Sequence, residues 1–360
     1  MTVSVRSFAK INLGLRIGAR RKDGFHELLT VYQTIGLHDV IRVSVARGSG
    51  IEIQCADPRV PKDDSNTCFR IVEKAMQEIN AKGRVTIEIV KRLPVQGGLG
   101  GASANAVAAL LGLEWALKKF LPTAERLRIA AEVGSDLPLF LVGGRVLGVG
   151  RGEQVYPLED LASMGCVVVT PEVGVSTPKA FAQWDRRVAG VAVTSAKAAG
   201  LRPGGQPGAA VPTPAWPGQR LGPAQAEVDK LTVPGASDRM GELGRELSAW
   251  LGESYSGAPF RRGRRENPLL GLVRAGIKND FEQVVFPEYP ELSEGKSALE
   301  RTGAKYASLS GSGSALYGLF ASKESARAAA ARLRKQGWSA QATVTLTRRE
   351  YWKKFLVSSF

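Results

Sequence analysis

The sequence predicts an α+β fold, in which antiparallel strands are covered by helices. Two stretches carry this prediction. Residues 85–111 run from an alternating strand through a glycine-rich loop into an alanine-rich helix. Residues 307–346 read as a strand, a glycine hairpin, a second strand, a helix and a last strand. An ending of this kind is typical of an antiparallel sheet with helices packed on it.

Length and composition leave room for two domains and exclude several classes of protein. The 360 residues, 44% of them hydrophobic, can bury a sizeable core, and we expect one domain at residues 1–155 and another at 156–360. No apolar run approaches a membrane span and the start lacks a signal-peptide pattern, so we expect a cytoplasmic protein. Three widely spaced cysteines and two histidines argue against a disulfide framework and a zinc site.

The net charge of +15 permits an anionic partner without selecting one. A basic balance suits nucleic acid, an anionic membrane surface or small polyanionic substrates. The densest basic cluster, Arg261–Arg265, follows a region rich in glycine and proline, which is typical of a solvated loop. The net charge by itself therefore does not identify the partner.

The glycine-rich loop at residues 93–105 is the most informative stretch. Four glycines in five residues, at Gly97–Gly101, let the backbone approach a ligand closely, and the helix that follows presents unpaired N–H groups. This combination favours a phosphate group. The loop is neither a Walker A loop nor a dinucleotide fingerprint, since it lacks Gly-Lys-Ser/Thr and the G-x-G-x-x-G spacing.

The remaining elements of the first half follow from alternation and capping. We expect strands at 3–5, 13–17, 31–45, 51–53 and 85–90, and helices at 67–76, 103–118 and 123–134. Asn66 reads as the cap of the first helix, and Trp115 as a core residue of the second.

The second half begins with a strand at 166–170 and a turn into a short helix near 177–181. Residues 186–228 shift to Gly, Pro, Ala and Arg, which indicates a flexible insertion. Helical patterns resume at 239–243, at 267–273 and after 282, followed by the hairpin near 310–314, a helix at 323–336 and a strand at 340–346.

Four side chains have both a structural and a chemical interpretation. Lys10 lies in an apolar strand and is either solvent-facing or a fixed charge directed into a cleft. Asp136 is either a helix cap or a carboxylate that, near Lys10, would accept a hydroxyl proton. Phe25 and His26 either pack in the core or hold a planar ring at a loop exit.

Three separated motifs together resemble those of the GHMP kinase superfamily. They are Ser7–Leu13, Pro94–Ser103 and Ser308–Ser314. Further segments resemble the members that act on a cytidine diphosphate-linked methylerythritol: Arg21–Leu28, Gly134–Pro138 and Asn279–Glu282. The resemblance covers roughly residues 5–185 and 265–322.

The resemblance implies a two-domain GHMP kinase fold, with a ribosomal-S5-like ATP-binding domain first and a ferredoxin-like α/β sandwich second. It implies transfer of the ATP γ-phosphate to the tertiary 2-hydroxyl of that methylerythritol, in the non-mevalonate isoprenoid precursor pathway. ATP and Mg²⁺ are then required, the partners are small molecules rather than nucleic acid or membrane, and we expect a monomer or weak homodimer.

Roles follow by position from the same resemblance. Asp136 is expected to be the catalytic base and Lys10 its charge partner. The expected substrate contacts are Phe25 and Phe181 on the two faces of cytosine, His26 at its edge, and Asn12 and Thr177 nearby. Asn66 is expected at the adenine, and the triphosphate at Pro94, Gly97, Gly98, Leu99, Gly100, Gly101, Ser103, Gly311 and Gly313.

The chain departs from the family pattern at three places. Ser103 is followed by Ala104 where two serines are common, which leaves Ser103 as the candidate hydroxyl for the metal. Phe25 stands where tyrosine is common, and the insertion at 186–228 has no familiar counterpart.

Two alternative functions stay open at this level. A sibling kinase acting on mevalonate or homoserine would share the lysine and the glycine loop, but those substrates have no base for the Asp23–His26 segment to bind. A nucleic-acid-binding protein would explain the charge and leave three glycine motifs unexplained.

Overall fold

The computed structural model describes residues 2–95, 97–198 and 278–357. The later part of the expected insertion, the helical patterns at 239–243 and 267–273, and the cluster Arg261–Arg265 lie outside these described residues. Within them, no helix combines the length and the apolar character that a membrane span needs.

The first half of the chain builds a sheet with helices on one side. Its elements are β1 (Thr2–Arg20), β2 (His26–Ala46), β3 (Ile51–Cys55), α1 (Thr67–Glu78), β4 (Arg84–Val90), α2 (Gly101–Leu117), α3 (Thr123–Val133), α4 (Leu137–Val142), β5 (Arg145–Val149) and β6 (Gln154–Pro157). The strand order is β3-β4-β2-β5-β6, with β1 also paired to β2. Only the β3–β4 pair is parallel.

The second half builds a smaller antiparallel sheet of order β10-β7-β9-β8. Its elements are β7 (Gly165–Val169), α5 (Thr177–Ala198), α8 (Glu282–Glu288), α9 (Pro290–Arg301), β8 (Tyr306–Leu309), β9 (Leu316–Phe320), α10 (Lys323–Lys335), β10 (Ala340–Val344) and α11 (Arg348–Phe355). The predicted α+β class is confirmed.

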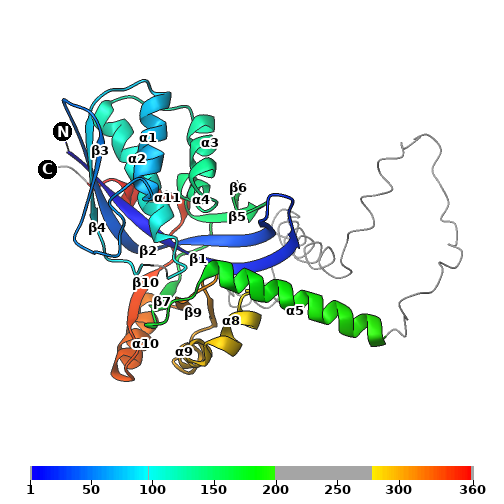
Figure 1. The fold of residues 1–360 in the computed structure, drawn as a ribbon. Coiled ribbons are helices and arrows are strands. Elements are labelled where there is room, and N and C mark those ends of the chain that lie inside the picture. The colour runs from blue at the N-terminus through cyan, green and yellow to red at the C-terminus, as the bar shows by residue number, and fades with distance from the viewer. Residues whose placement is uncertain (1, 96, 199–277, 358–360) are drawn as a thin grey trace, which may run out of the picture.

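The two sheets face each other, and each carries its helices on the outer side (Figure 1). One apolar cluster lies between α1, α2, α3 and the first sheet, and a second lies between α8, α9, α10 and the second sheet. A third cluster fills the space between the sheets, with Ile11 and Val31 from the first and Val168 and Leu319 from the second. The seam between the sheets is therefore a continuous core.

The start of the chain is one strand rather than two. Residues 3–5 and 13–17 were expected to be separate strands, with Lys10 and Asn12 between or within them. Instead β1 runs unbroken against β2, and its register shifts between Phe8 and Lys10 and again between Asn12 and Gly14. Bulges of this kind re-aim side chains, so the polar residues are accommodated without ending the strand.

Three further expectations need correction. Residues 186–198, assigned to the flexible insertion, continue helix α5, since this part of the segment is rich in alanine. Trp115 is 47% exposed and lies edge-on to Phe120, because α2 turns this position away from the core near its end. Helix α11 was not anticipated, although Thr347 and Glu350 form a capping box at its start.

The expected domain boundary at residues 155/156 remains a prediction. Strand β6, which spans it, pairs with β5 of the first sheet. The chain also returns to the first unit at its end, where Tyr351 of α11 packs in the core beside Phe8 and donates to the Phe140 carbonyl.

We predict that Ile41→Ala lowers the free energy of unfolding by about 2–5 kcal/mol, because this fully buried β2 side chain packs between the first sheet and its helices. Urea unfolding measures the change. The control is Arg42→Ala on the same strand, which breaks only a half-exposed ion pair with Glu88 and is expected to cost about 1 kcal/mol or less. Equal losses in the two variants would contradict the proposed core.

Candidate active site

A buried lysine and a partly exposed aspartate form the centre of the site. Nζ of Lys10, on β1, lies 3.3 Å from Oδ2 of Asp136, and the two side chains are 4% and 32% exposed. Lys10 therefore points inward. Asp136 occupies the cap position of α4, yet its side chain makes no capping hydrogen bond. The carboxylate is left to face the lysine on one side and solvent on the other.

Asn12 holds the lysine in place. Nζ of Lys10 donates to Oδ1 of Asn12 over 2.7 Å, and Nδ2 of Asn12 donates to the Thr30 hydroxyl over 2.8 Å. Both residues lie between the first two of the three register shifts of β1. Asn12 is 1% exposed and its side chain contacts Lys10. The expected contact between Asn12 and the substrate remains a prediction.

Tyr32 is a member of the site that the sequence analysis missed. Its hydroxyl donates to Oδ1 of Asp136 over 3.0 Å, and its ring lies 5.5 Å from Nζ of Lys10. Complete burial raises the pKa of Tyr32 well above its ordinary value, and the negative charge of Asp136 raises it further. The phenol therefore stays a donor to the carboxylate.

The glycine loop packs against this centre so closely that side chains are excluded. Gly98 and Gly100 have φ of +72° and +69°. A Cβ on Gly98 would lie 2.1 Å from the Ser310 carbonyl oxygen, and one on Gly100 would lie 3.0 Å from Cγ of Lys10. Glycine is needed at these two positions for both conformation and space.

The hairpin between β8 and β9 completes the contact between the three motifs. The Ser310 hydroxyl donates to the Gly98 carbonyl over 3.0 Å, and the backbone N–H of Lys10 donates to the Leu99 carbonyl over 2.9 Å. A Cβ on Gly311 would lie 3.5 Å from Nζ of Lys10. Gly313 closes the turn with φ of +96°. Segments 7–13, 94–103 and 308–314 thus adjoin, as a shared site requires.

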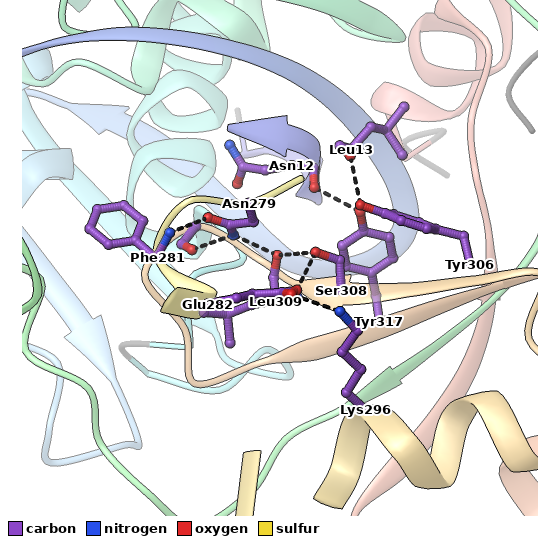
Figure 2. A network of polar contacts seen from close by, with 11 residues as sticks. Asn12, Leu13, Asn279, Phe281, Glu282, Lys296, Tyr306, Ser308, Leu309 and Tyr317 are labelled. Atoms are coloured by element: carbon purple, nitrogen blue, oxygen red, sulfur yellow. Dashed lines mark hydrogen bonds and ion pairs between the residues drawn. The ribbon is translucent and has the colours of Figure 1, made fainter. Parts of the chain in front are cut away.

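Figure 2 shows how the Asn279–Glu282 segment holds this hairpin. Nδ2 of Asn279 donates to the carbonyls of Leu309 and Gly311 over 2.9 and 2.7 Å. Glu282 accepts from the Ser308 hydroxyl over 2.7 Å and from the Leu309 N–H over 2.9 Å. This segment therefore sets the path of the hairpin beside Lys10.

Strand β1 is tied to the second sheet by hydroxyl groups in the same network. The Tyr317 hydroxyl donates to the Asn12 carbonyl over 2.7 Å, and the Tyr306 hydroxyl to the Leu13 carbonyl over 3.2 Å (Figure 2). Buried Asp280 accepts from the Ile17 N–H over 3.0 Å. The two halves of the chain are therefore joined along the part of β1 that carries Lys10 and Asn12.

A cavity of about 390 Å³ opens beside the glycine loop. It is lined by Pro94, Gly97, Gly98, Leu99, Gly100, Gly101, Ser103 and Asn66, together with the cations Arg59 and Lys91. The first turn of α2 forms part of its wall. Backbone N–H groups at a helix start, glycine and two cations are the features that bind phosphate groups.

Asn66 lines this cavity while its amide is already engaged. Oδ1 accepts from the Cys68 N–H over 2.8 Å, and Nδ2 donates to the Pro61 carbonyl over 2.6 Å. The residue is thus the N-cap of α1, as expected from the sequence. Contact with adenine remains a prediction.

Asp39 anchors the strand that leads into the glycine loop, and sequence reasoning missed it. It is fully buried and accepts from Nζ of Lys91 over 2.6 Å, from the Leu93 N–H over 2.8 Å and from Nδ2 of Asn105 over 3.0 Å. A buried carboxylate needs several such donors. Asp39 therefore joins the two ends of the loop, at residues 91–93 and in α2.

The residues expected around cytosine are arranged differently from a sandwich. His26 and Phe181 stack on each other, with ring centroids 4.8 Å apart and 11° between planes. Nε2 of His26 lies 2.6 Å from Oδ1 of Asp185. Phe25 is 51% exposed and lies under the Arg151 guanidinium. His26 covers one face of Phe181, and the expected sandwich of cytosine between Phe25 and Phe181 remains a prediction.

Thr177 lies at the start of α5, where its hydroxyl is 2.7 Å from that of Ser312. It joins the hairpin to α5, the helix that carries Phe181. The cytosine candidates and the lysine centre are therefore connected through the hairpin.

Comparisons with known proteins agree with this arrangement. The family described as "GHMP kinases N terminal domain" matches residues 66–144, and "GHMP kinases C terminal" matches residues 265–338. A homoserine kinase structure from Cytophaga hutchinsonii, 19% identical, aligns with a TM-score of 0.62 over 96% of this chain and 95% of its own. At that identity the likeness concerns the fold, which is that of the GHMP kinases.

More similar relatives narrow the class. A protein named 4-diphosphocytidyl-2-C-methyl-D-erythritol kinase from Solibacter usitatus is 33% identical over 88% of this chain and 80% of its own length. One of the same name from Acaryochloris marina is 31% identical over 92% and 91%. A crystal structure of 4-(cytidine 5'-diphospho)-2C-methyl-D-erythritol kinase, 26% identical, aligns with a TM-score of 0.63 over 95% and 98%. The chain belongs to the 4-diphosphocytidyl-2-C-methyl-D-erythritol kinase family of GHMP kinases.

We predict that Gly98→Ala weakens ADP binding at least about tenfold, since the added methyl would displace the Ser310 carbonyl and reshape the loop. Isothermal titration calorimetry measures the affinity. Gly174→Ala is the matched control, because a Cβ there meets nothing within 4 Å. Unchanged ADP affinity in Gly98→Ala would contradict the assignment of the cavity to the nucleotide.

Proposed function

We propose that this protein transfers the γ-phosphate of ATP to the 2-hydroxyl of 4-diphosphocytidyl-2-C-methyl-D-erythritol, giving the 2-phosphate and ADP. The step belongs to the non-mevalonate isoprenoid precursor pathway. The observation that carries the proposal is the Lys10–Asp136 pair next to the glycine loop. The names of the relatives supply the substrate.

In this proposal Asp136 is the base. Its carboxylate is open to solvent on one side and accepts a hydrogen bond from Tyr32 on the other. The exposed side accepts the proton of the substrate hydroxyl as its oxygen attacks the γ-phosphorus. Tyr32 fixes the orientation of the carboxylate, because its hydroxyl remains protonated.

Lys10 has two tasks. Its charge keeps Asp136 oriented, and its ammonium lies beside the glycine loop, where the transferring phosphoryl group would pass. Positioned charges that meet developing negative charge are a major source of catalysis in phosphoryl transfer. Asn12 accepts a hydrogen bond from the Lys10 ammonium and so holds the ammonium between Asp136 and the glycine loop.

Mg²⁺ enters this proposal with the nucleotide. The described residues contain no group of three or more His, Cys, Asp or Glu side chains arranged for a metal. Ser103, in the first turn of α2, offers a hydroxyl in the cavity and is the candidate protein ligand. Mg²⁺ commonly keeps phosphate and water ligands, so one hydroxyl fits a Mg-ATP complex. When bound, the ion would neutralise phosphate charge.

The cytidine part of the substrate is proposed to bind at Phe25, His26 and Phe181. The three rings come from the start of β2 and from α5, and Phe25 is the one with an exposed face. Arg151 lies over the other face of Phe25. A base stacked on Phe25 would also be within reach of a cation for the diphosphate.

A cytoplasmic location and a monomer or weak homodimer stay predictions.

We predict that Asp136→Asn lowers turnover of the cytidine substrate with Mg-ATP by about 10²–10⁴-fold, the usual contribution of a general base, while ADP affinity stays within about twofold. A coupled assay of ADP release measures the rate. Glu125→Gln, on the exposed surface of α3, is the control and should keep full activity.

The same assay tests the substrate. Turnover confined to 4-diphosphocytidyl-2-C-methyl-D-erythritol supports the proposal, whereas faster turnover of mevalonate or homoserine would assign the chain to a sibling activity. Full activity in Asp136→Asn would show that Asp136 is not the catalytic base, and it would leave the proposed substrate unaffected.

We predict that Phe25→Ala raises the apparent KM for the cytidine substrate with little change in KM for ATP. The expected loss is about 1–3 kcal/mol, the range for a base stacked on an aromatic ring. Steady-state kinetics measures both constants. Phe120→Ala removes an equally exposed phenylalanine elsewhere and should leave both constants unchanged. An unaltered KM in Phe25→Ala would exclude stacking on this ring.

A further inference from the structure

A second pocket lies where the two sheets meet, away from the nucleotide cavity. Its volume is about 510 Å³. It is lined by Arg6, Phe8, Gly36, His38, Lys323, Arg327, Ala342, Thr343, Val344 and Lys354. These residues come from β1, β2, β10, α10 and α11, and none of them lines the nucleotide cavity. The pocket takes no part in the function proposed above.

The charged side chains that line this pocket are all cationic. Four of them come from three separate elements: Arg6, Lys323 with Arg327, and Lys354. No carboxylate is among the lining residues. Glu324 interacts with Lys323 and Arg327, and Glu350 with Lys354, but neither glutamate enters the lining. Four cations around one concavity outnumber these two carboxylates and attract an anion.

Backbone groups add to this character. Lys323 is the first residue of α10, whose capping box at Ser322 marks the positive end of a helix of 13 residues. Arg6 donates through Nη1 to the Lys354 carbonyl over 2.7 Å, which joins β1 to α11 and orients the guanidinium. The pocket is therefore partly organised before any ligand arrives.

His38 adds a polar ring to the pocket lining. Its Nδ1 lies 2.9 Å from the Gly36 carbonyl, so Nδ1 bears the proton and Nε2 is left for another partner. Its ring packs on Phe8, with centroids 5.2 Å apart. Partial burial lowers the pKa of His38, and the charges of Arg92 and Arg6 lower it further, while the Gly36 carbonyl and Asp39 act in the opposite direction. His38 therefore contributes a hydrogen-bonding group rather than a further fixed charge.

We propose that this pocket is a binding site for a compact polyanion of the diphosphate class. A volume of several hundred Å³ is that of a small-molecule site. Four cations in one concavity match two adjacent phosphoryl groups, whereas nucleic acid is usually met by an extended basic stripe. The floor of Phe8, Ala342 and Val344 also leaves room for an apolar part of the ligand.

Such a ligand would connect the two halves of the protein. Arg6 and His38 belong to the first sheet, and Lys323 and Arg327 to the helix that covers the second. An anion bound by both groups would bridge the two sheets. Binding to the folded state only would also raise the unfolding temperature as the logarithm of ligand concentration once the site is saturated.

Inorganic diphosphate is the test probe, titrated calorimetrically into the full chain with saturating ADP so that the nucleotide cavity is filled. Saturable one-to-one binding is expected. Lys323→Ala/Arg327→Ala should weaken it at least about tenfold, because two charge-assisted contacts are removed. Arg332→Ala/Lys335→Ala is the control, since it removes the same charge from the same helix outside the pocket and should leave the affinity unchanged.

Three results would overturn the proposal. One is the absence of saturable binding to the unaltered protein, and another is an equal loss in the two double variants, which would mean general charge attraction. The third is tight binding of a single-stranded oligonucleotide, lost in Lys323→Ala/Arg327→Ala, without diphosphate binding. Circular dichroism and basal turnover verify that both variants fold. Because neither variant touches the kinase site, the outcome is independent of the proposed reaction.

Discussion

The structure depends on how a single buried ammonium group, that of Lys10, is stabilised. A lysine that is 3% exposed loses its hydration and must find compensating partners inside the protein. It finds them in the side-chain amide oxygen of Asn12, the Asp136 carboxylate and the ring of Tyr32. The first two register shifts of β1 allow this set to converge, and the close approach of Gly100 is possible only because no side chain intervenes. The position of the Lys10 ammonium and the packing around it thus impose the same requirement.

The site belongs to neither half of the chain alone. The glycine loop comes from the first half, and the hairpin that contacts it comes from the second. Asn279 and Glu282 hold that hairpin from behind, while Tyr317 reaches across to the backbone of Asn12. Because these contacts are buried and directional, small displacements between the halves would alter the position of Lys10. The continuous core between the sheets resists such displacement.

Sequence reasoning could predict the parts of the site that leave local signals. The glycine loop, the hairpin, Lys10 and Asp136 were all predicted, and the structure brings them together. Tyr32 and Asp39 escaped notice because their importance depends on strand register and on donors from distant segments, which no local pattern records. The stacking of His26 on Phe181 escaped for a similar reason, since α5 brings its ring from about 150 positions along the chain. The start of the segment at residue 186 was assigned to the insertion because glycine and proline dominate its later part, although its first residues are rich in alanine and continue α5.

The joining of the first strand to the last residues has a consequence for synthesis of the chain. The Val357 N–H donates to the Ser4 carbonyl, and Val5 bridges Leu356, so the two ends of the described chain lie side by side (Figure 1). The hairpin at residues 309–315 must also arrive before the glycine loop takes its final path. A nascent chain emerges from the ribosome N-terminus first. The glycine loop therefore reaches its final packing only after the hairpin at residues 309–315 has been synthesised.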